Sequence, residues 1–432
     1  KSVQAILDKD ILHTMDSLGM VKGEERKIKL ANFFNQKFEV IVGNPPYSGV
    51  LSKELEKNLD KYYTTHKGIT GSKNSASLFI ERGLQLLIDQ GYLGFIIPNT
   101  IARMGEYRKL REFILKTTHI KNIVDEGSPF GESNLEMITL ILKKNKEHRN
   151  ENIIQILNRR SENFYDNQIK QEIFNNKGLF CIYYDTLCEK IEYKTIKLGN
   201  ISKNSEMYSA SPNDTTIYTK TPNNHWFVRG RNIGRYYLHH SSGDLYLVDL
   251  NILPSKVKRV LNSKKIAIQY IGGLSATIVD EGIGLYRSAH HLYIKNKDYS
   301  IYYILAIYNS NLMNYYFTRT ISNKSRLTIH LDALYTDLLP IKIATHEQQQ
   351  PLIHLADSML NLNKKLQSIT LDLNQEFKHQ DEVLEAYYNY VNKREEIRRQ
   401  IRETDDKICL KNNQLSNSFF TIIKSMITSL LR

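Results

Sequence analysis

This 432-residue chain has few cysteines, no long apolar run and no excess of acidic residues. Its cysteines, Cys181, Cys188 and Cys409, are odd in number and lack the spacing of metal ligands. We therefore expect neither disulfides nor zinc, and a reduced, cytoplasmic protein. No signal peptide and no apolar run of membrane-spanning length is present, so we expect no membrane partner. The apolar stretch at residues 419–431 is short and contains Lys424, which predicts a helix that packs on a partner.

Acidic residues are outnumbered, with 46 Asp and Glu against 59 Lys and Arg, which gives a formal net charge of +13. A basic chain favours a polyanionic partner, because neutralised phosphates release counterions. The hydrophobic share of 41% and the charged share of 24% are ordinary for a globular protein, and the length suits two or three domains. The chain begins at Lys1 and not at Met, so we expect a fragment or a processed end.

The strongest functional signal is an apolar segment that ends in Asn44-Pro45-Pro46-Tyr47. The apolar side chains of residues 38–42 predict a buried strand, and the glycine that follows allows a turn. Each proline fixes its own φ angle and pushes the residue before it into extended geometry. The Asn44 side chain and the Pro45 carbonyl are therefore expected to point in fixed directions from the carboxyl end of the strand, where open α/β sheets bind ligands.

A fixed amide oxygen and a fixed carbonyl can accept both N–H bonds of a planar amino group whose lone pair is delocalised. Such a nitrogen is a poor nucleophile until it becomes pyramidal, and two acceptors placed for that geometry stabilise the transition state more than the ground state. Tyr47 adds an aromatic face on which a flat base could stack. The alternative is an ordinary strand end with a Pro-Pro turn, although chance gives this tetrapeptide in about one such chain in a thousand.

Asn44-Pro45-Pro46-Tyr47 after an apolar strand resembles motif IV of the adenine-N6 DNA methyltransferases, in the gamma arrangement where target recognition follows catalysis. The resemblance implies that these four residues are catalytic, that the target adenine is flipped out of the duplex, and that S-adenosylmethionine donates the methyl group. The same tetrapeptide also occurs in glutamine and some RNA methyltransferases. By itself it indicates the chemistry and leaves the substrate open.

The segment before motif IV lacks the glycine-bearing strand-to-helix turn with which this family holds its cofactor. The glycines up to Asn44 are Gly19, Gly23 and Gly43, and none lies in such a turn. Asn32 occupies a position where the family often has an acidic residue. Cofactor contacts therefore stay unassigned, with Asn32 and Asn44 as candidates, and we expect that a complementary methyltransferase chain is needed.

Strands and helices alternate after motif IV. Residues 91–99 and 120–124 predict strands, and residues 107–115 predict a basic amphipathic helix. This alternation favours an α/β fold with a doubly wound parallel sheet, here a partial Rossmann-like one. Residues 91–115 also resemble motifs V and VI of the same family.

Residues 125–142 resemble the motif VIII hairpin of the family. There an aromatic side chain stacks on the extruded adenine, which implies that Phe130 covers the face opposite Tyr47. Without the resemblance, a Phe beside Pro is more often a plug in the core. The carboxylates nearby are interpreted as a solvated turn; they are Asp125, Glu126 and Glu132.

A basic, polar stretch at residues 143–152 gives the first domain boundary. We expect a partial methyltransferase domain in residues 1–145, an α+β recognition domain in residues 153–345, and a helical region in residues 346–432. Apolar residues at 352–369 repeat at intervals of three and four, which predicts a helix that packs on a partner helix.

The expected recognition domain contains three clusters of aromatic side chains with donors suited to bases or phosphates. Arg can fork onto guanine, Asn onto adenine, and Lys onto phosphate. Each cluster alone is better explained as ordinary surface, but three in one basic chain favour DNA binding. The candidate contacts are Trp226, Arg229, Arg231, Asn232, Arg235, Tyr286, Arg287, Arg319, Lys324 and Arg326.

Residues 226–233, 265–270 and 338–341 are similar to the target-recognition domains of type IIG restriction-modification enzymes and type I specificity subunits. The two resemblances together imply a site-specific adenine-N6 DNA methyltransferase of a restriction-modification or phage-defence system, acting on double-stranded DNA. We find no nuclease carboxylate–lysine cluster and expect no metal. Residues 409–432 depart from the family pattern, which predicts an altered terminus. One alternative is a DNA-recognition module that depends on another chain for cofactor; a weaker one is a glutamine or RNA methyltransferase.

Overall fold

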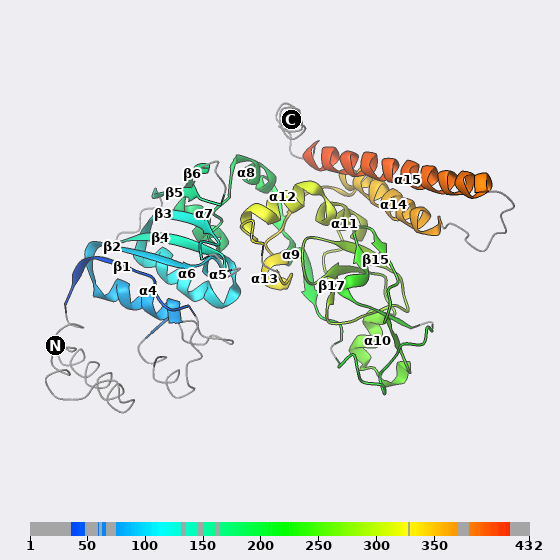
Figure 1. The fold of residues 1–432 in the computed structure, drawn as a ribbon, viewed down its shortest axis with the longest axis horizontal. Coiled ribbons are helices and arrows are strands. Elements are labelled where there is room, and N and C mark those ends of the chain that lie inside the picture. Colours follow the sequence, from blue (N-terminus) through cyan, green and yellow to red (C-terminus); the bar gives the residue numbers. More distant parts are fainter. Residues whose placement is uncertain are drawn as a thin grey trace. The chain divides into compact units, whose positions relative to one another are not determined.

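The computed structural model divides the chain into two compact units, Lys1–Tyr183 and Tyr184–Arg432 (Figure 1). The residues that it describes are 36–47, 59, 63–65, 75–130, 135–145, 151–160, 165–208, 210–223, 225–326, 329–369 and 380–414. Asn32, Glu132 and residues 419–431, for which the sequence makes predictions, lie outside these ranges. Within them, no helix combines the length and the apolar character needed to cross a membrane.

The first unit is built on a mixed sheet with the strand order β1-β2-β4-β3-β5-β6 in the described part of the chain. The strands are β1 (Phe38–Gly43), β2 (Leu87–Pro98), β3 (Thr118–Gly127), β4 (Met137–Lys144), β5 (Ile153–Asn158) and β6 (Tyr165–Lys170). β1 runs parallel to β2, and β3 parallel to β5, but β4 lies antiparallel between β2 and β3. The predicted α/β fold is confirmed in the parallel pairs, but the sheet as a whole is mixed and not the parallel sheet that the alternation favoured. The β3–β4 connection is too short for the crossover that parallel neighbours need, so the chain returns as the predicted hairpin.

Helices of the first unit pack on this sheet. They are α4 (Ser75–Leu86), α5 (Thr100–Arg103), α6 (Arg108–Thr117) and α7 (Gln171–Lys177). α4 packs against β2, and α6 packs against β3 (Figure 1). The strands predicted at residues 91–99 and 120–124 and the helix predicted at 107–115 are confirmed as β2, β3 and α6, and the longer strands begin before the predicted residues.

The edge strand β1 is more exposed than its sequence predicts. Val40 and Val42 are 58% and 78% exposed, although the apolar run suggests burial on both faces. β1 has only β2 as a described neighbour in the sheet. Its outward face therefore has no described element packed over Val40 and Val42, and the expectation of a fully buried strand is corrected.

The first unit extends beyond the domain boundary expected at residues 143–152. β5 pairs with β3, and β6 pairs with β5, so residues 153–170 complete the sheet of the first unit. The two compact units divide between Tyr183 and Tyr184. A polar stretch alone cannot identify a boundary when the strand after it returns to the same sheet.

The second unit contains short, mostly antiparallel strands in two four-stranded sheets, with orders β16-β10-β13-β9 and β15-β14-β17-β8. Its strands are β7 (Thr195–Lys197), β8 (Ser202–Ser205), β9 (Tyr218–Thr219), β10 (Trp226–Val228), β11 (Ile233–Gly234), β12 (Tyr237–Leu238), β13 (Leu245–Leu247), β14 (Lys265–Gln269), β15 (Ala276–Val279), β16 (Gly284–Leu285), β17 (Ala289–Ile294) and β18 (Pro340–Lys342). Phe227, Leu247 and Leu285 are completely buried in one core cluster. That core holds the loops that carry the candidate DNA contacts.

The last two helices of the second unit, α14 and α15, pack against each other and lie side by side (Figure 1). The helices are α8 (Thr186–Glu192), α9 (Leu198–Ile201), α10 (Ser255–Leu261), α11 (Ile301–Asn309), α12 (Asn311–Thr320), α13 (Ala333–Thr336), α14 (His346–Ser368) and α15 (Gln380–Gln414). Leu352, Ala356 and Met359 of α14 are buried. The predicted packing of residues 352–369 on a partner helix is confirmed, and that partner is α15 of the same chain.

Candidate functional site

Asn44-Pro45-Pro46-Tyr47 follows the carboxyl end of β1. Gly43, the last residue of β1, is paired with Phe95 of β2, and a Cβ at this glycine would lie 3.3 Å from the Phe95 ring. Asn44 and Pro46 are exposed, whereas Pro45 is buried. The close approach of β1 to Phe95 thus fixes where the tetrapeptide leaves the sheet, with the Asn44 side chain on the surface.

Two hydrogen bonds hold this tetrapeptide. The Tyr47 hydroxyl donates to the side-chain oxygen of Asn44. The Ser75 hydroxyl, at the start of α4, donates to the Pro46 carbonyl over 2.6 Å. Burial raises the pKa of Tyr47, so its phenol stays a proton donor at neutral pH. An amide oxygen has two lone pairs, so Asn44 keeps one for a second donor.

Phe130 lies after β3 and is 42% exposed, so its ring is available to a flat partner. The chain turns toward it at Gly127, whose φ of +64° is in the left-handed region that favours glycine. No described contact joins Phe130 to Tyr47. Their shared action on one base therefore stays a prediction.

The acidic residues at the end of β3 do not form the solvated turn that the sequence suggests. Asp125 is completely buried and Glu126 is only partly exposed, with Glu126 accepting a hydrogen bond from Thr139 over 2.6 Å. Asp125 is neutralised by Arg160, whose Nε lies 2.7 Å from its Oδ2. The interpretation is wrong for Asp125 because its basic partner is 35 residues away in the sequence.

The candidate DNA contacts of residues 226–235 and those of residues 286–287 lie on loops that meet in the second unit. The backbone N–H of Gly230 donates to the Ser288 hydroxyl over 3.0 Å, which joins the loop after β10 to the loop before β17. The Arg229 guanidinium lies 5.7 Å from the centre of the Tyr286 ring. Arg231 and Arg287, in the same two loops, are exposed. The fold therefore places cations from two distant sequence segments on adjoining loops.

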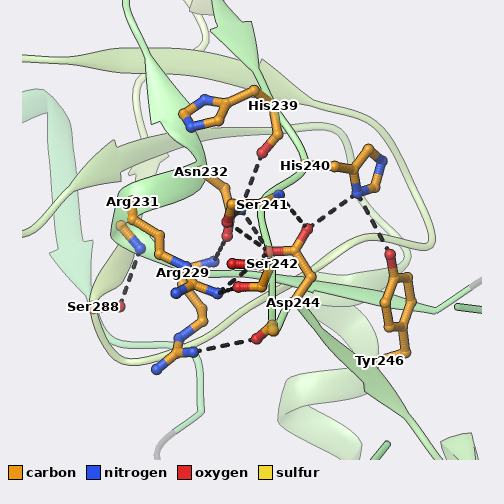
Figure 2. A network of polar contacts seen from close by, with 12 residues as sticks. Arg229, Arg231, Asn232, His239, His240, Ser241, Ser242, Asp244, Tyr246 and Ser288 are labelled. Atoms are coloured by element: carbon orange, nitrogen blue, oxygen red, sulfur yellow. Dashed lines mark hydrogen bonds and ion pairs between the residues drawn. The ribbon is translucent and has the colours of Figure 1, made fainter. Parts of the chain in front are cut away.

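Figure 2 shows the carboxylate that organises these loops, Asp244, which is 5% exposed. It accepts hydrogen bonds from Asn232 Nδ2 over 2.8 Å and from the Ser241 hydroxyl over 3.0 Å, and lies 3.1 Å from His240 Nδ1. The Arg231 guanidinium lies 3.8 Å from the same carboxylate and donates to the Ser242 carbonyl over 2.6 Å. Asp244 thus fixes the loop beside the exposed Arg231.

Three of the predicted contact residues lie inside the domain. Asn232 is completely buried, and its amide binds the Arg229 N–H, the His239 carbonyl and Asp244. Trp226 is 8% exposed and stacks on His240 with ring centres 3.9 Å apart. Tyr286 is 4% exposed. In this fold these side chains support the loops from inside. The Asn232 amide is buried and already hydrogen-bonded, so it cannot reach a base.

The remaining predicted contacts differ in exposure. Arg235 donates to Asp405 over 2.7 Å, and Arg319 lies 3.0 Å from Asp185; their side chains are 35% and 20% exposed. Lys324 and Arg326 are exposed. A phosphate reaches exposed side chains more easily, so Lys324 and Arg326 are the stronger candidates.

Sequence reasoning missed His240 and Asp244 in this region. The signal was the polar, turn-forming run His239-His240-Ser241-Ser242-Gly243-Asp244, in which Gly243 has a φ of +71°. A short acidic residue after such a turn commonly accepts hydrogen bonds from its own loop. The stacking of His240 on Trp226 had no signal in the sequence.

The Asp244 network predicts a pH-dependent stability. Burial acts to raise the pKa of Asp244, but hydrogen bonds from Asn232, Ser241 and His240 outweigh it and hold that pKa below its ordinary value of 3.8. The stabilisation is therefore complete above the pKa of the unfolded chain and is lost as the pH falls through the lower folded value. Asp244→Asn should lower the free energy of unfolding by about 1.5–3 kcal/mol near neutral pH, and by less at about pH 3, in urea titrations.

Asp249→Asn is the matched control for this prediction. Asp249 is an exposed residue that accepts from the Asn251 N–H at the start of a 3-10 turn, where Asn serves nearly as well as Asp. An Asp244→Asn effect that equals the control, or that does not shrink in acid, would contradict the assigned role of the carboxylate.

Residues 36–47, which lead into and through the candidate tetrapeptide, offer no glycine cradle that fits S-adenosylmethionine. Such a cradle needs a glycine whose open side admits the ligand. The one glycine in residues 36–47, Gly43, has its open side against the Phe95 ring. Asn32, the other candidate from the sequence, lies outside the described residues. Neither Gly43 nor Asn32 is therefore assigned a contact with the cofactor.

Comparisons with known proteins match one segment in each of the two compact units. Residues 5–130 match the Eco57I restriction-modification methylase family, and residues 225–341 match the TaqI-like C-terminal specificity domain. The "Type II restriction enzyme and methyltransferase RM.Eco57I" of Escherichia coli is 34% identical over 148 residues, which are 33% of this chain and 15% of that protein. The "Type II methyltransferase M.BstVI" of Geobacillus stearothermophilus is 38% identical over 98 residues, which are 22% of this chain and 17% of that protein.

Each match therefore spans less than a fifth of the length of these two relatives. A solved structure of the type IIL restriction-modification enzyme MmeI in complex with DNA is 12% identical, with a TM-score of 0.49, over 86% of this chain and 57% of that chain. The sequence resemblance to restriction-modification methyltransferases with a target-recognition domain is confirmed by the two family matches.

Proposed function

We propose that this chain, which is similar to the restriction-modification methyltransferases in its Eco57I-type methylase segment and its TaqI-like specificity domain, methylates the N6 amino group of an adenine within a specific duplex sequence. The observation that carries the proposal is the exposed Asn44 side chain at the carboxyl end of β1. The methyl donor is S-adenosylmethionine, and the site of action is cytoplasmic DNA.

The chemistry proposed for this chain concerns the amino group of the target. The Asn44 side-chain oxygen and the Pro45 carbonyl accept its two N–H bonds and favour the pyramidal nitrogen of the transition state. The Tyr47 hydroxyl donates to the same Asn44 oxygen, and so holds the amide in one orientation. Tyr47 and Phe130 enclose the flipped base, which lowers the cost of taking it out of the stack.

Cations at the surface of the second unit, of which Arg229 is partly exposed and the others are exposed, are proposed to hold the duplex. Arg229, Arg231 and Arg287 lie on adjoining loops, and Lys324 and Arg326 add further positive charge. We assign Trp226, Asn232 and Tyr286 to supporting those loops, because all three are buried. Arg235 and Arg319 are secondary candidates, because their side chains are only 35% and 20% exposed.

We expect that removing two exposed cations gives a complex with duplex DNA that is weaker and less sensitive to salt. The Arg231→Ala/Arg287→Ala variant should bind duplex DNA more weakly, and its slope of log K against log salt should be smaller by about 1.8, since each neutralised phosphate contributes about 0.9. The same titration on Arg398→Ala/Arg402→Ala removes two exposed charges of α15 as a control. Equal salt slopes for the two variants would remove both loops from the DNA interface.

The second candidate function is a DNA-recognition module that depends on another chain for the cofactor. It is favoured by the open side of Gly43, the one glycine of residues 36–47, which faces the Phe95 ring and leaves no room there for a cofactor. Titration of S-adenosylmethionine into the chain by calorimetry separates the two. Saturable binding supports the autonomous enzyme, and no binding supports the module. Stronger binding to RNA than to duplex DNA at one stated salt concentration would favour an RNA methyltransferase over both.

A further inference from the structure

Three charged side chains meet at the two ends of the connection that carries Phe130. Arg160, two residues beyond β5, donates from Nε to Asp125 Oδ2 over 2.7 Å and from Nη1 to Glu136 Oε1 over 2.8 Å. Asp125 lies near the end of β3, and Glu136 immediately precedes β4. The side chains of Arg160, Asp125 and Glu136 are only 12%, 1% and 3% exposed, so water screens these pairs little.

Neighbouring groups fix this cluster from other elements. The Tyr183 hydroxyl donates to Asp125 Oδ2 over 2.6 Å, and the Gly127 N–H donates to Asp125 Oδ1 over 3.0 Å. A Cβ at Gly127 would lie 3.2 Å from Cγ of Arg160. The Arg160 stem is therefore the surface against which the chain turns as it leaves β3 toward Phe130. The backbone of Glu136 is held as well, because its carbonyl accepts from the Asn99 N–H over 2.8 Å.

We propose that Arg160 is a positioning residue that ties the two ends of the β3–β4 connection together and so presents Phe130 to the target base. The inference rests on the proposed function and adds a residue that lies outside the segment matched to the methylase family, residues 5–130. Without the guanidinium, the buried carboxylates of Asp125 and Glu136 lose the cation that bridges them, which weakens the link between the ends of the connection. Arg160 acts through the position of Phe130 and does not touch the substrate.

The matched pair of variants is Arg160→Gln and Arg159→Gln. Arg159 is the adjacent residue; its side chain is 58% exposed and lies 3.4 Å from Glu126, so its loss changes the charge equally outside the cluster. Methyl transfer from labelled S-adenosylmethionine to unmodified genomic DNA is measured, with duplex affinity and the thermal unfolding midpoint for each variant. We expect Arg160→Gln to lose about 10²-fold in kcat with little change in KM for DNA. Arg160→Lys, which keeps one charged contact, should recover part of the loss.

A double-mutant cycle with Phe130→Ala separates positioning from general destabilisation. If Arg160 acts through Phe130, Arg160→Gln should add little to the loss already caused by Phe130→Ala. Hydrogen exchange should also quicken at residues 128–130 and 135–136 in Arg160→Gln, but not in Arg159→Gln. Equal kcat in the two Gln variants, or a full Arg160 effect in the Phe130→Ala background, would overturn the inference. If the unchanged chain transfers no methyl group to DNA even with a complementing chain present, the proposed function fails, whereas equal hydrogen exchange in the two Gln variants shows by itself that Arg160 does not hold the connection.

Discussion

An Asn44→Ala variant is expected to lose about 10²–10³-fold in methyl-transfer kcat and to bind duplex DNA as tightly as the unchanged chain. The Asn44 amide oxygen is one of the two acceptors proposed for the target amino group. Alanine removes the acceptor and also the partner of the Tyr47 hydroxyl. The acceptor interaction belongs to the pyramidal transition state more than to the bound base, so the loss should appear in kcat and not in KM for DNA.

The control for this prediction is Asn361→Ala, an exposed residue of α14 that lies in the second unit. It changes the same side-chain chemistry outside the proposed active site, and its activity should equal that of the unchanged chain. If the chain alone does not bind the cofactor, the comparison is made with the complementing chain present. Methyl transfer by Asn44→Ala at the rate of the control would remove Asn44 from the mechanism.

An Arg111→Ala variant is expected to lower the free energy of unfolding by about 3–5 kcal/mol. The sequence places Arg111 on a basic helix face, but the side chain is 1% exposed. Its Nε donates to the Gly178 carbonyl over 2.8 Å, and its Nη1 donates to the carbonyls of Ile101 and Met104 over 2.8 and 2.7 Å. Alanine leaves these buried carbonyls without that donor and opens a cavity between α5, α6 and the end of α7.

Arg108→Ala provides the comparison in the same helix. Arg108 is 65% exposed in its side chain and pairs with Glu112 over 2.9 Å. An exposed pair of this kind contributes about 0.5 kcal/mol, so urea unfolding should barely distinguish this variant from the unchanged chain. Equal unfolding midpoints for Arg108→Ala and Arg111→Ala would show that the three carbonyls do not depend on the guanidinium.

Local sequence signals predicted the parts of the first unit that local physics decides. The apolar runs of β2 and β3, the amphipathic α6 and the β3–β4 hairpin were all identified from periodicity or motif resemblance and are confirmed. The same holds for the family resemblance, which the matches at residues 5–130 and 225–341 confirm. The tetrapeptide at Asn44 stands at the carboxyl end of a strand, as its spacing indicated.

Long-range pairing could not be predicted in this way. Asp125 begins the turn-forming run Asp125-Glu126-Gly127-Ser128 in the sequence, but the fold buries it against Arg160, which follows a strand that the sequence assigned to another domain. Asn232 has the chemistry of a base-reading residue, and the fold instead consumes its amide around Asp244. Val42 is part of an apolar run, yet β1 lies at an edge of the sheet and leaves it 78% exposed. For Asp125 and Asn232 the deciding partner is distant in the sequence or brought close by a turn, and for Val42 it is the place of β1 at the end of the described strand order.

The most direct test is the identity of the nucleoside that receives the methyl group. Duplex DNA without prior modification is incubated with the chain and S-adenosylmethionine carrying a labelled methyl group, then digested to nucleosides and analysed by mass spectrometry. The account predicts that the label appears in N6-methyldeoxyadenosine and that it disappears in Asn44→Ala. Label in deoxycytidine, or label in RNA or a glutamine-containing peptide offered in parallel but not in DNA, would contradict the central claim that Asn44-Pro45-Pro46-Tyr47 acts on adenine in DNA.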